Sequence, residues 1–504
     1  MPNFDIKTFN GGSNNSIDGG LIPKNQGQVV ENALVSDGNL VSVNGLLIVN
    51  PLVTFSPLDL GHYGADNRSV ISYLSKFYWS INDALSAPYY AGNLYGLGVD
   101  YPVAAPSVSS TTGSLTGTFK YCHTFLSDDG WESAPGINNN WSSTLVLSAQ
   151  GGSIALPANP GGMSKVRTYR TIHEGNDYYL VSETASFSTT ITDTLSDLDL
   201  LVGELMNTLN HVPPPDGGKF LTEANGTFFL AVANVIYYSE QGNPHAWPPL
   251  NTVNMPGTIT GLVEEFEGIL AFTSNATARI TGYDVLTIAK NIIPTNQGCK
   301  NWRTISTVTD APIWESNDGL CIWDGSVIKL VSHDRYNIDF TSTHSVVSND
   351  IYYLFHSAGA LTFDRRSGDV FAELSNFIVN EYAWYDGSAD KLYLYDGATS
   401  VFEYGAGVQQ ALTYLSPHLN GATGEADYLN NGTSEKTFRR IWLRNDSPVT
   451  VTLYVESVQV FSGVMAAGDR FVYFAAGLDG RYAEVKLETT GTIFDFIIEY
   501  EVVL

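Results

Sequence analysis

The sequence predicts an all-β protein, built as a β-propeller with an inserted β-sandwich and further β units at both ends. Three observations lead to this fold class. The 504 residues include 47 Gly, 28 Tyr and 24 Phe but only 5 Met, a mixture of turn formers and aromatic residues that favours strands over helices. Short apolar runs alternate with polar residues at a period of two. A strand-and-turn unit also recurs about every 40 residues in the second half of the chain.

Residues 1-105 are predicted to form an N-terminal arm and platform, and one expected role of the arm is to close a propeller blade. Apolar runs at Leu34-Val35 and at 46–49 flank Asp37-Gly38, which indicates a strand, a turn and a second strand. Residues 69–86 leave two alternatives open. Ile71, Leu74 and Phe77 fit a short helix, whereas the aromatic residues of the same segment fit a strand.

Residues 106-212 are predicted to form the β-sandwich, because strands of about six residues recur at roughly ten-residue spacing. Phe119, Tyr121, His123 and Phe125 alternate with other side chains at a period of two. The expected order is a strand at 119–125, a turn at 128–130, strands at 145–147 and 154–156 around Gly151-Gly152, a strand at 167–169, a turn at 174–176, and strands at 179–181 and 191–194. The layout resembles a fibronectin-III-like module.

Residues 213-410 are predicted to form propeller blades after a stiff linker at 212–218. Turn-rich elements follow apolar strands at Ser239, Gly282, Asp324, Asp364 and Asp396, with spacings of 43, 42, 40 and 32 residues. The best internal match joins 320–325 with 392–397. Such spacing is typical of propeller blades. The alternative is an irregular β-sandwich in which the Asp-Gly turns recur by chance.

Residues 411-504 are predicted to form a C-terminal β unit. Ala483, Val485 and Leu487 alternate with charged residues, and the strand at 494–502 alternates aromatic and aliphatic residues with mostly acidic ones. Strands of this kind bury one face and expose the other.

The net charge of −27 argues against a groove that grips nucleic acid through its phosphates, since no Lys/Arg cluster is longer than two residues. Two interpretations of the acidity stay open: solubility, and a conduit wall that repels phosphate so that DNA slides. Three cysteines are too few for a disulfide framework or a zinc site. No secretory signal and no membrane span are expected.

No catalytic, cofactor-binding or metal-binding residues are predicted, and we expect the protein not to be an enzyme. The sequence lacks GxSxG, HExxH, CxxC and P-loop motifs. Glu264, Glu265 and Glu267 could supply a glycosidase pair, but a solvated edge is the preferred interpretation. Asp197 and Asp199 are too few to hold calcium. His245 is expected to be a packed loop residue, and the segment 316–323 departs from the spacing of sialidase Asp boxes.

Two segments carry a resemblance to a known family. The first runs from Phe119 to Arg170 and contains Ser127-Asp128-Asp129-Gly130-Trp131-Glu132; the second, 237–247, contains Glu240-Gln241-Gly242-Asn243-Pro244-His245. With Pro23, Asn32, Asp37-Gly38 and Gly45 near the start, and 298–320 further on, they resemble the tail nozzle proteins of short-tailed bacteriophages, also called tail tubular protein B or packaged-DNA stabilisation proteins.

The resemblance implies a structural virion protein without enzymatic activity or cofactor. Its expected partners are five further copies in a homohexamer, the tail adaptor and portal proteins, tail fibre or spike proteins, and double-stranded DNA that passes through the lumen without sequence-specific binding. The ring would extend the portal–adaptor channel, retain packaged DNA and conduct it at ejection. The expected location is the virion tail, after assembly in the host cytoplasm and without membrane insertion.

Two other functions stay open on the sequence. A carbohydrate-binding or receptor-binding propeller of a virion would use exposed aromatic residues, with Trp131, Trp247 and Trp323 as candidates. A generic propeller scaffold would bind other proteins as a monomer.

Overall fold

The structure is a computed structural model, and nearly all of its regular elements are strands. It describes residues 3–6, 12–13, 26–27, 29–31, 33–36, 39–42, 44–49, 68–73, 76–81, 89–91, 97–136, 140–293, 295–333, 336–338, 340–365, 370–375, 382–386, 391–395, 401–409, 412–416, 436–474 and 478–502. The chain divides into two compact units. One comprises Met1–Thr54, Ser274–Thr277 and Pro294–Leu504, and the other comprises Phe55–Thr273 and Ala278–Ile293.

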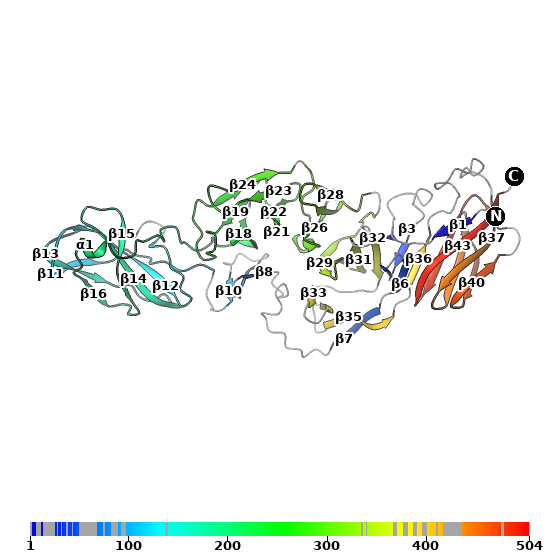
Figure 1. Cartoon of the computed structure of the whole chain (residues 1–504), viewed down its shortest axis with the longest axis horizontal. Helices are drawn as coiled ribbons and strands as arrows, with labels where there is room; N and C mark the ends of the chain where they lie inside the picture. The colour runs from blue at the N-terminus through cyan, green and yellow to red at the C-terminus, as the bar shows by residue number, and fades with distance from the viewer. Residues whose placement is uncertain are drawn as a thin grey trace. The chain divides into compact units, whose positions relative to one another are not determined.

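A β-sandwich of two three-stranded antiparallel sheets forms one part of the second unit (Figure 1). One sheet contains β11 (Val108–Phe119), β13 (Leu145–Ala155) and β16 (Thr190–Asp193). The other contains β12 (Tyr121–Ser127), β14 (Met163–Thr171) and β15 (Tyr178–Thr184). The short helix α1 (Asp197–Leu200) follows β16 and is capped by the Ser196 side chain. The all-β prediction is therefore confirmed for this segment.

The expectation of two short strands around Gly151-Gly152 is wrong, because both glycines lie inside the single strand β13. A Cβ on Gly151 would lie 2.8 Å from the carbonyl oxygen of Thr112, and one on Gly152 would lie 2.6 Å from the hydroxyl of Tyr121. The glycines thus permit close approach of backbone and side chain within a strand, a role that a sequence pattern cannot distinguish from a turn.

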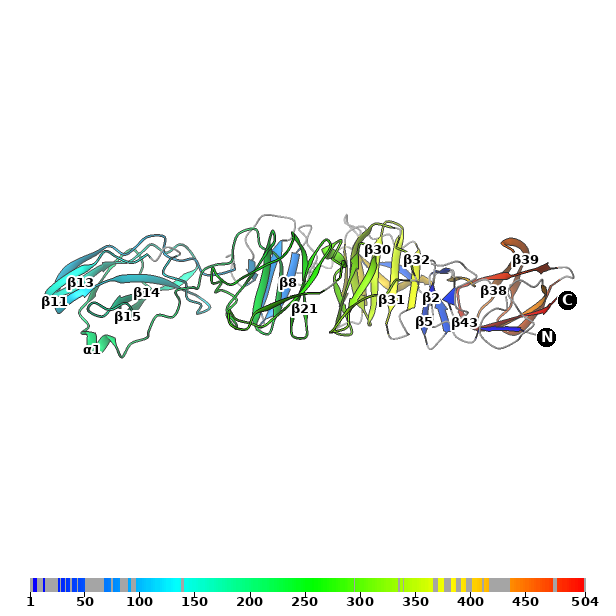
Figure 2. The same ribbon diagram turned by 90° about the horizontal axis from the view of Figure 1, so that it is seen from above.

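Three blade-like sheets complete the second unit. They contain β8 (Arg68–Tyr73), β9 (Lys76–Ile81) and β10 (Tyr89–Ala91); β17 (Lys219–Ala224), β18 (Thr227–Val232), β19 (Val235–Tyr238) and β20 (Thr252–Asn254); and β21 (Ile259–Glu265), β22 (Gly268–Thr273), β23 (Thr277–Thr281) and β24 (Ala289–Ile292). Their first strands, β8, β17 and β21, are successive neighbours (Figure 2). The ambiguous segment 69–86 is thereby settled as strand wherever it is described.

Three further blade-like sheets lie in the first unit. They contain β25 (Ser306–Val308), β26 (Ala311–Ser316), β27 (Gly319–Trp323) and β28 (Ile328–Leu330); β29 (Ser342–Ser348), β30 (Ile351–His356), β31 (Gly359–Asp364) and β32 (Val370–Ser375); and β33 (Tyr382–Asp386), β34 (Lys391–Tyr395), β35 (Val401–Gln409) and β7 (Asn44–Val49). The 3₁₀ helix η1 (Trp302–Thr304) precedes β25. Sheets of four neighbouring antiparallel strands are the blade unit of a β-propeller, which is the predicted fold class.

The strand β7 shows how the N-terminal arm is used. It pairs antiparallel with β35, with Val49 opposite Val401, and does not pair with the strand at Leu34-Val35. That strand is β5 (Ala33–Ser36), and its partner is β6 (Asn39–Ser42). The predicted turn at Asp37-Gly38 lies outside the described residues.

The unequal spacing of the sequence repeat has a structural explanation. Ser239, Gly282 and Asp324 each follow the third strand of their sheets, and Asp364 ends the third strand of the next. In the last blade the repeat element instead follows the second strand, β34, so the spacing shortens by about one strand. Asp396 itself lies outside the described residues.

The C-terminal unit is a second sandwich, and its two sheets enclose an extensive apolar core. One sheet has the order β40-β37-β43-β6-β5, with β1 paired to β43. The other has the order β4-β36-β42-β38-β39 and is continuous, through β4, with the blade strands β29-β30-β31-β32 in one 11-stranded sheet. The strands not yet bounded are β1 (Asn3–Ile6), β2 (Gly12–Ser13), β3 (Gln26–Gly27), β4 (Val29–Glu31), β36 (Leu412–Leu415), β37 (Lys436–Asn445), β38 (Val449–Val455), β39 (Val458–Met465), β40 (Gly468–Tyr473), β41 (Asp479–Gly480), β42 (Ala483–Thr489) and β43 (Thr492–Val502).

Candidate functional site

The two segments that carry the family resemblance meet at one place, the junction between the sandwich and the sheet that begins at β17. The rings of Trp131 and His245 lie with their centroids 5.2 Å apart. The backbone N–H of Gly98 donates a hydrogen bond of 3.1 Å to His245 Nδ1, and the Tyr78 ring stands edge-on to the same imidazole. His245 is only 4% exposed, so it is a packed loop residue of this junction.

The segment around His211 ties the two parts of the junction together. His211 Nδ1 lies 3.1 Å from the carbonyl oxygen of Glu132, and its Nε2 lies 3.3 Å from a carboxylate oxygen of Glu240. Burial lowers the pKa of His211, but the hydrogen bonds and charges of Glu240 and Glu132 together outweigh burial, so the net shift of the pKa is upward. The imidazole therefore links a sandwich segment to a blade segment best when it is protonated.

The proline-rich segment after His211 is packed into the junction and is not simply a spacer. The backbone N–H of Trp247 donates to the carbonyl of Val212 at 2.9 Å. Gly98 has a φ of +105°, and a Cβ there would lie 2.6 Å from the Cα of Pro213. Glycine is required at this contact both by its left-handed backbone and by the close approach of the proline.

Glu132 of the first segment accepts hydrogen bonds from three side chains. The Arg167 guanidinium binds it at 2.8 Å, the Tyr169 hydroxyl donates to it at 2.7 Å, and the Thr124 hydroxyl also donates to it. Arg167 reaches two more carboxylates, those of Glu183 at 2.8 Å and Glu204 at 3.1 Å. Burial and the negative charge of Glu132 raise the pKa of Tyr169, so the phenol remains a neutral donor.

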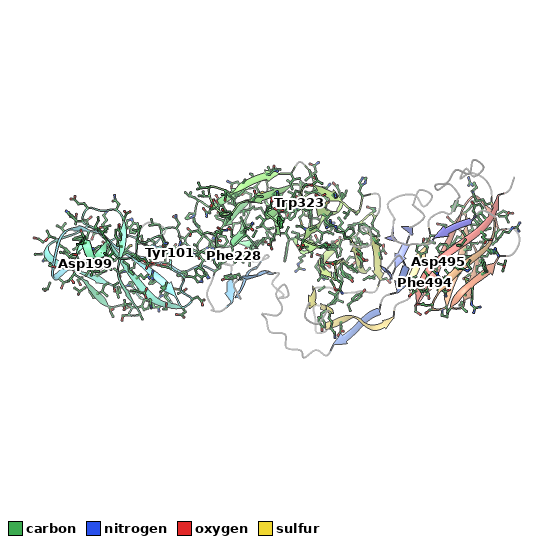
Figure 3. The ribbon with its side chains drawn as sticks, viewed as in Figure 1. Tyr101, Asp199, Phe228, Trp323, Phe494 and Asp495 are labelled. Atoms are coloured by element: carbon green, nitrogen blue, oxygen red, sulfur yellow. The ribbon has the colours of Figure 1, made fainter. Side chains whose placement is uncertain are left out.

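A second ion cluster lies inside the sandwich, and its central pair is fully buried. Arg170 binds Asp193 at 2.8 Å, and both side chains have no exposed surface. The other arm of the guanidinium binds Asp197 at 2.9 Å, and the Tyr121 hydroxyl donates to Asp193 at 2.9 Å. Asp199 hydrogen-bonds Ser196 at the start of α1, where Figure 3 labels it. Asp197 and Asp199, the two residues weighed as calcium ligands, are thus both hydrogen-bonded to protein groups.

The acidic cluster before Gly268 is also held by an arginine. Arg279 on β23 binds Glu265 at 2.9 Å and Glu267 at 2.6 Å. The Glu265 side chain is only 2% exposed, so the expectation of a solvated edge is wrong for this residue. The sequence could not show this because the guanidinium comes from another strand of the sheet. Hydrogen bonding by Glu265 raises the pKa of Arg279, despite partial burial.

The remaining candidates also contribute to the packing. Trp247 and Trp323 are buried, so these two rings offer no face to a glycan, and the third candidate, Trp131, contacts His245. The segment from Ser316 to Gly319 is the turn between β26 and β27, closed by a hydrogen bond of 2.9 Å from the Ser316 hydroxyl to the Gly319 carbonyl. Within the part of the chain that the structure describes, no three His, Cys, Asp or Glu side chains form a metal-binding group. The described residues include no helix long and apolar enough to cross a membrane.

Comparisons with known proteins do not place the chain in a family. No family model matches it, and no curated protein matches it. Among solved structures, it is similar to a chain of the mitotic checkpoint complex (9% identity, TM-score 0.27, covering 63% of this chain and 98% of that one). It is also similar to Hsv2 of Kluyvelomyces marxianus (9%, TM-score 0.26, 53% and 85%) and to apo AztD of Citrobacter koseri (10%, TM-score 0.27, 58% and 97%). Scores this low carry no argument about function.

Proposed function

We propose that this chain is a structural subunit of a bacteriophage tail nozzle, a hexamer that extends the portal–adaptor channel, retains packaged DNA and conducts it at ejection. The observation that supports this function best is the use of the basic side chains within the fold. Six arginines pair with carboxylates of the same chain: Arg167, Arg170, Arg279, Arg440, Arg444 and Arg481.

This pairing matters because the chain has 25 basic residues against 52 acidic ones. A guanidinium that is hydrogen-bonded to carboxylates has few donors left for phosphate, and the unpaired charge that remains is negative. DNA affinity at moderate salt comes mainly from Lys and Arg contacts to phosphates. A wall without such contacts gives duplex DNA few places to bind, which suits a passage through which DNA must slide.

The resemblance segments support the same proposal in another way. They form one junction, from Trp131 and His211 to His245, that fixes the sandwich to the sheet beginning at β17. Their side chains serve packing and ion pairing, as a subunit of a rigid assembly requires.

Electron cryomicroscopy of the purified chain, mixed with the portal and adaptor proteins of its phage, tests the proposal directly. We expect a sixfold ring that continues the portal channel. A chain that does not join the adaptor, or that is absent from the tail of mature particles, contradicts it.

A gel-shift titration with duplex DNA tests the role of charge. We expect no complex at about 0.15 M salt, since the chain has a net charge of −27 and several of its guanidinium groups are paired with its own carboxylates. Tight binding whose affinity falls steeply with salt would contradict a non-adhesive wall.

A further inference from the structure

A groove lies on the outward face of one sheet of the C-terminal sandwich, across the neighbouring strands β36, β42 and β38. Its volume is about 520 Å³, which falls within the range of small-ligand sites, about 300–1,000 Å³. We call it the β42 groove, because β42 is the middle strand of the three. It is lined by Thr413, Leu415, Tyr454, Ser457, Glu484, Lys486 and Glu488.

Strand register places the lining side chains of all three strands on one face. On β42, Val485 and Leu487 belong to the sandwich core, so the alternate residues between and beside them point outward. Cross-strand neighbours share a face, and Tyr454 lies opposite Glu484, Leu415 opposite Lys486, and Thr413 opposite Glu488. Successive outward residues of a strand are about 7 Å apart, so the groove extends about 14 Å from Glu484 to Glu488.

The polar groups of the groove are held in place before any ligand binds. Lys486 Nζ lies 2.8 Å from a carboxylate oxygen of Glu488. The Ser457 hydroxyl donates to Glu484 at 3.4 Å, and it lies 3.1 Å from the Tyr482 hydroxyl. The residue before Ser457 is tied to the sheet as well, because Glu456 binds Arg481 at 3.0 Å. Fixed side chains lose little conformational freedom on binding, which favours affinity.

The order of polar groups along β42 indicates the chemistry of the ligand. A carboxylate, an ammonium group and a second carboxylate follow one another at Glu484, Lys486 and Glu488. A carboxylate only accepts hydrogen bonds and an ammonium group only donates them, whereas a hydroxyl group does both. A ligand with several hydroxyl groups can therefore satisfy the whole row. Tyr454 and Leu415 flank this row from β38 and β36 and supply apolar contact surface.

The charges of the groove argue against ionic ligands. Two carboxylates and one ammonium group leave a net negative charge, which disfavours a phosphate, sulfate or carboxylate ligand. A cationic ligand would have to compete with Lys486 for Glu488, which already binds it at 2.8 Å. A neutral polyhydroxyl ligand meets neither obstacle.

We propose that the β42 groove is a binding site for a short neutral oligosaccharide. The Tyr454 ring packs against the apolar face of a sugar ring, Glu484 and Glu488 accept hydrogen bonds from sugar hydroxyls, and Lys486 donates to one. The site lies on the C-terminal sandwich, away from the tryptophans considered as glycan contacts in the sequence, and the inference does not depend on the proposed nozzle function.

A glycan array tests the ligand class, with the full chain as the analyte. The array carries neutral oligosaccharides of glucose, galactose, mannose and N-acetylglucosamine, beside sulfated and sialylated ones. We expect binding to neutral members only, with a Kd below about 1 mM when hits are titrated by calorimetry. Absence of binding to every neutral oligosaccharide at this limit, or binding to charged ones alone, overturns the inference.

Variants test the position of the site. Tyr454→Ala and Lys486→Met should each weaken binding at least about tenfold, because one removes the ring and the other the donor. Tyr454→Phe keeps the ring and should retain most of the affinity. Tyr473→Ala is the matched control, since Tyr473 is 69% exposed on β40 of the other sheet.

Circular dichroism melts report whether each variant is folded. Unchanged binding by folded Lys486→Met and Tyr454→Ala would place the glycan elsewhere and overturn the assignment. Loss of binding in both, with Tyr473→Ala unchanged, supports it. Assembly on the adaptor is measured separately, so a chain that binds no glycan leaves the nozzle proposal standing, and a chain that fails to join the adaptor leaves the groove assignment standing.

Discussion

Asp193→Asn should destabilise the inserted sandwich strongly, because it leaves the Arg170 charge without its buried partner. Asparagine keeps an oxygen for the Tyr121 hydroxyl but removes the negative charge that faces Arg170 at 2.8 Å. Breaking one side of a buried ion pair costs about 3–5 kcal/mol. Arg170 retains Asp197, whose side chain is 34% exposed, so we expect the lower end, about 3 kcal/mol.

Hydrogen exchange measured by mass spectrometry can detect this change within the full chain. A loss of about 3 kcal/mol corresponds to roughly hundredfold faster exchange of the most protected amides, so peptides from β12 and β14 should show it. Lys165→Met is the control, because it removes the partly exposed pair with Glu183 in the same sheet. Such a pair contributes less than about 1 kcal/mol, or about fivefold in exchange. Exchange in Asp193→Asn that stays within fivefold of wild type would refute the reasoning.

Two further predictions concern the junction and the blades. His211→Gln should lower the melting temperature most at acidic pH. Because the pKa of His211 is raised in the folded state, its ion pair with Glu240 stabilises the fold fully below about pH 6.5, the pKa of an unperturbed histidine. This stabilisation is lost as the pH rises through the pKa of His211 in the folded protein. A decrease in the melting temperature that is the same at every pH would contradict this prediction. Gly268→Ala, whose Cβ would lie 2.1 Å from the Ile280 carbonyl oxygen, should cost about 2 kcal/mol in denaturant titrations. Gly257→Ala, whose Cβ would have its nearest atom at 3.7 Å, should leave the free energy of unfolding nearly unchanged. Equal losses of stability in the two variants would show that the backbone near Gly268 moves to accommodate the Cβ.

Features encoded by neighbouring residues could be predicted from the sequence. The turn at 128–130 forms, with Gly130 at a φ of +87°, and Glu174 in the second predicted turn has a φ of +55°. The alternation at Ala483, Val485 and Leu487 matches buried positions of β42. In each case the structure depends on interactions between residues close in the chain, so a pattern of a few residues is enough to predict it.

Features that depend on distant segments could not be predicted. The period-two pattern at 119–125 suggests one buried face, yet all five residues from Tyr121 to Phe125 are buried. Tyr121 and Phe125 face the core between the sheets, while Cys122 packs with Trp141 and Met206 on the other side. That second layer comes from irregular segments, which carry no periodic signal. The pairing of β7 with β35 could not be predicted either, because the two strands are far apart in the chain and no local pattern links them.

The ion pairs show what the clustered carboxylates do in place of forming a catalytic or metal site. Arg279 holds Glu265 and Glu267, Arg170 holds two aspartates, and Arg167 holds three glutamates. A planar guanidinium with five donors can serve several carboxylates at once, which an ammonium group cannot do in the same geometry. In a chain with 52 acidic and 25 basic residues, one arginine can therefore satisfy several acids, as Arg167, Arg170 and Arg279 do here. Under the proposed function, a guanidinium held in this way has fewer donors to offer to the phosphates of passing DNA.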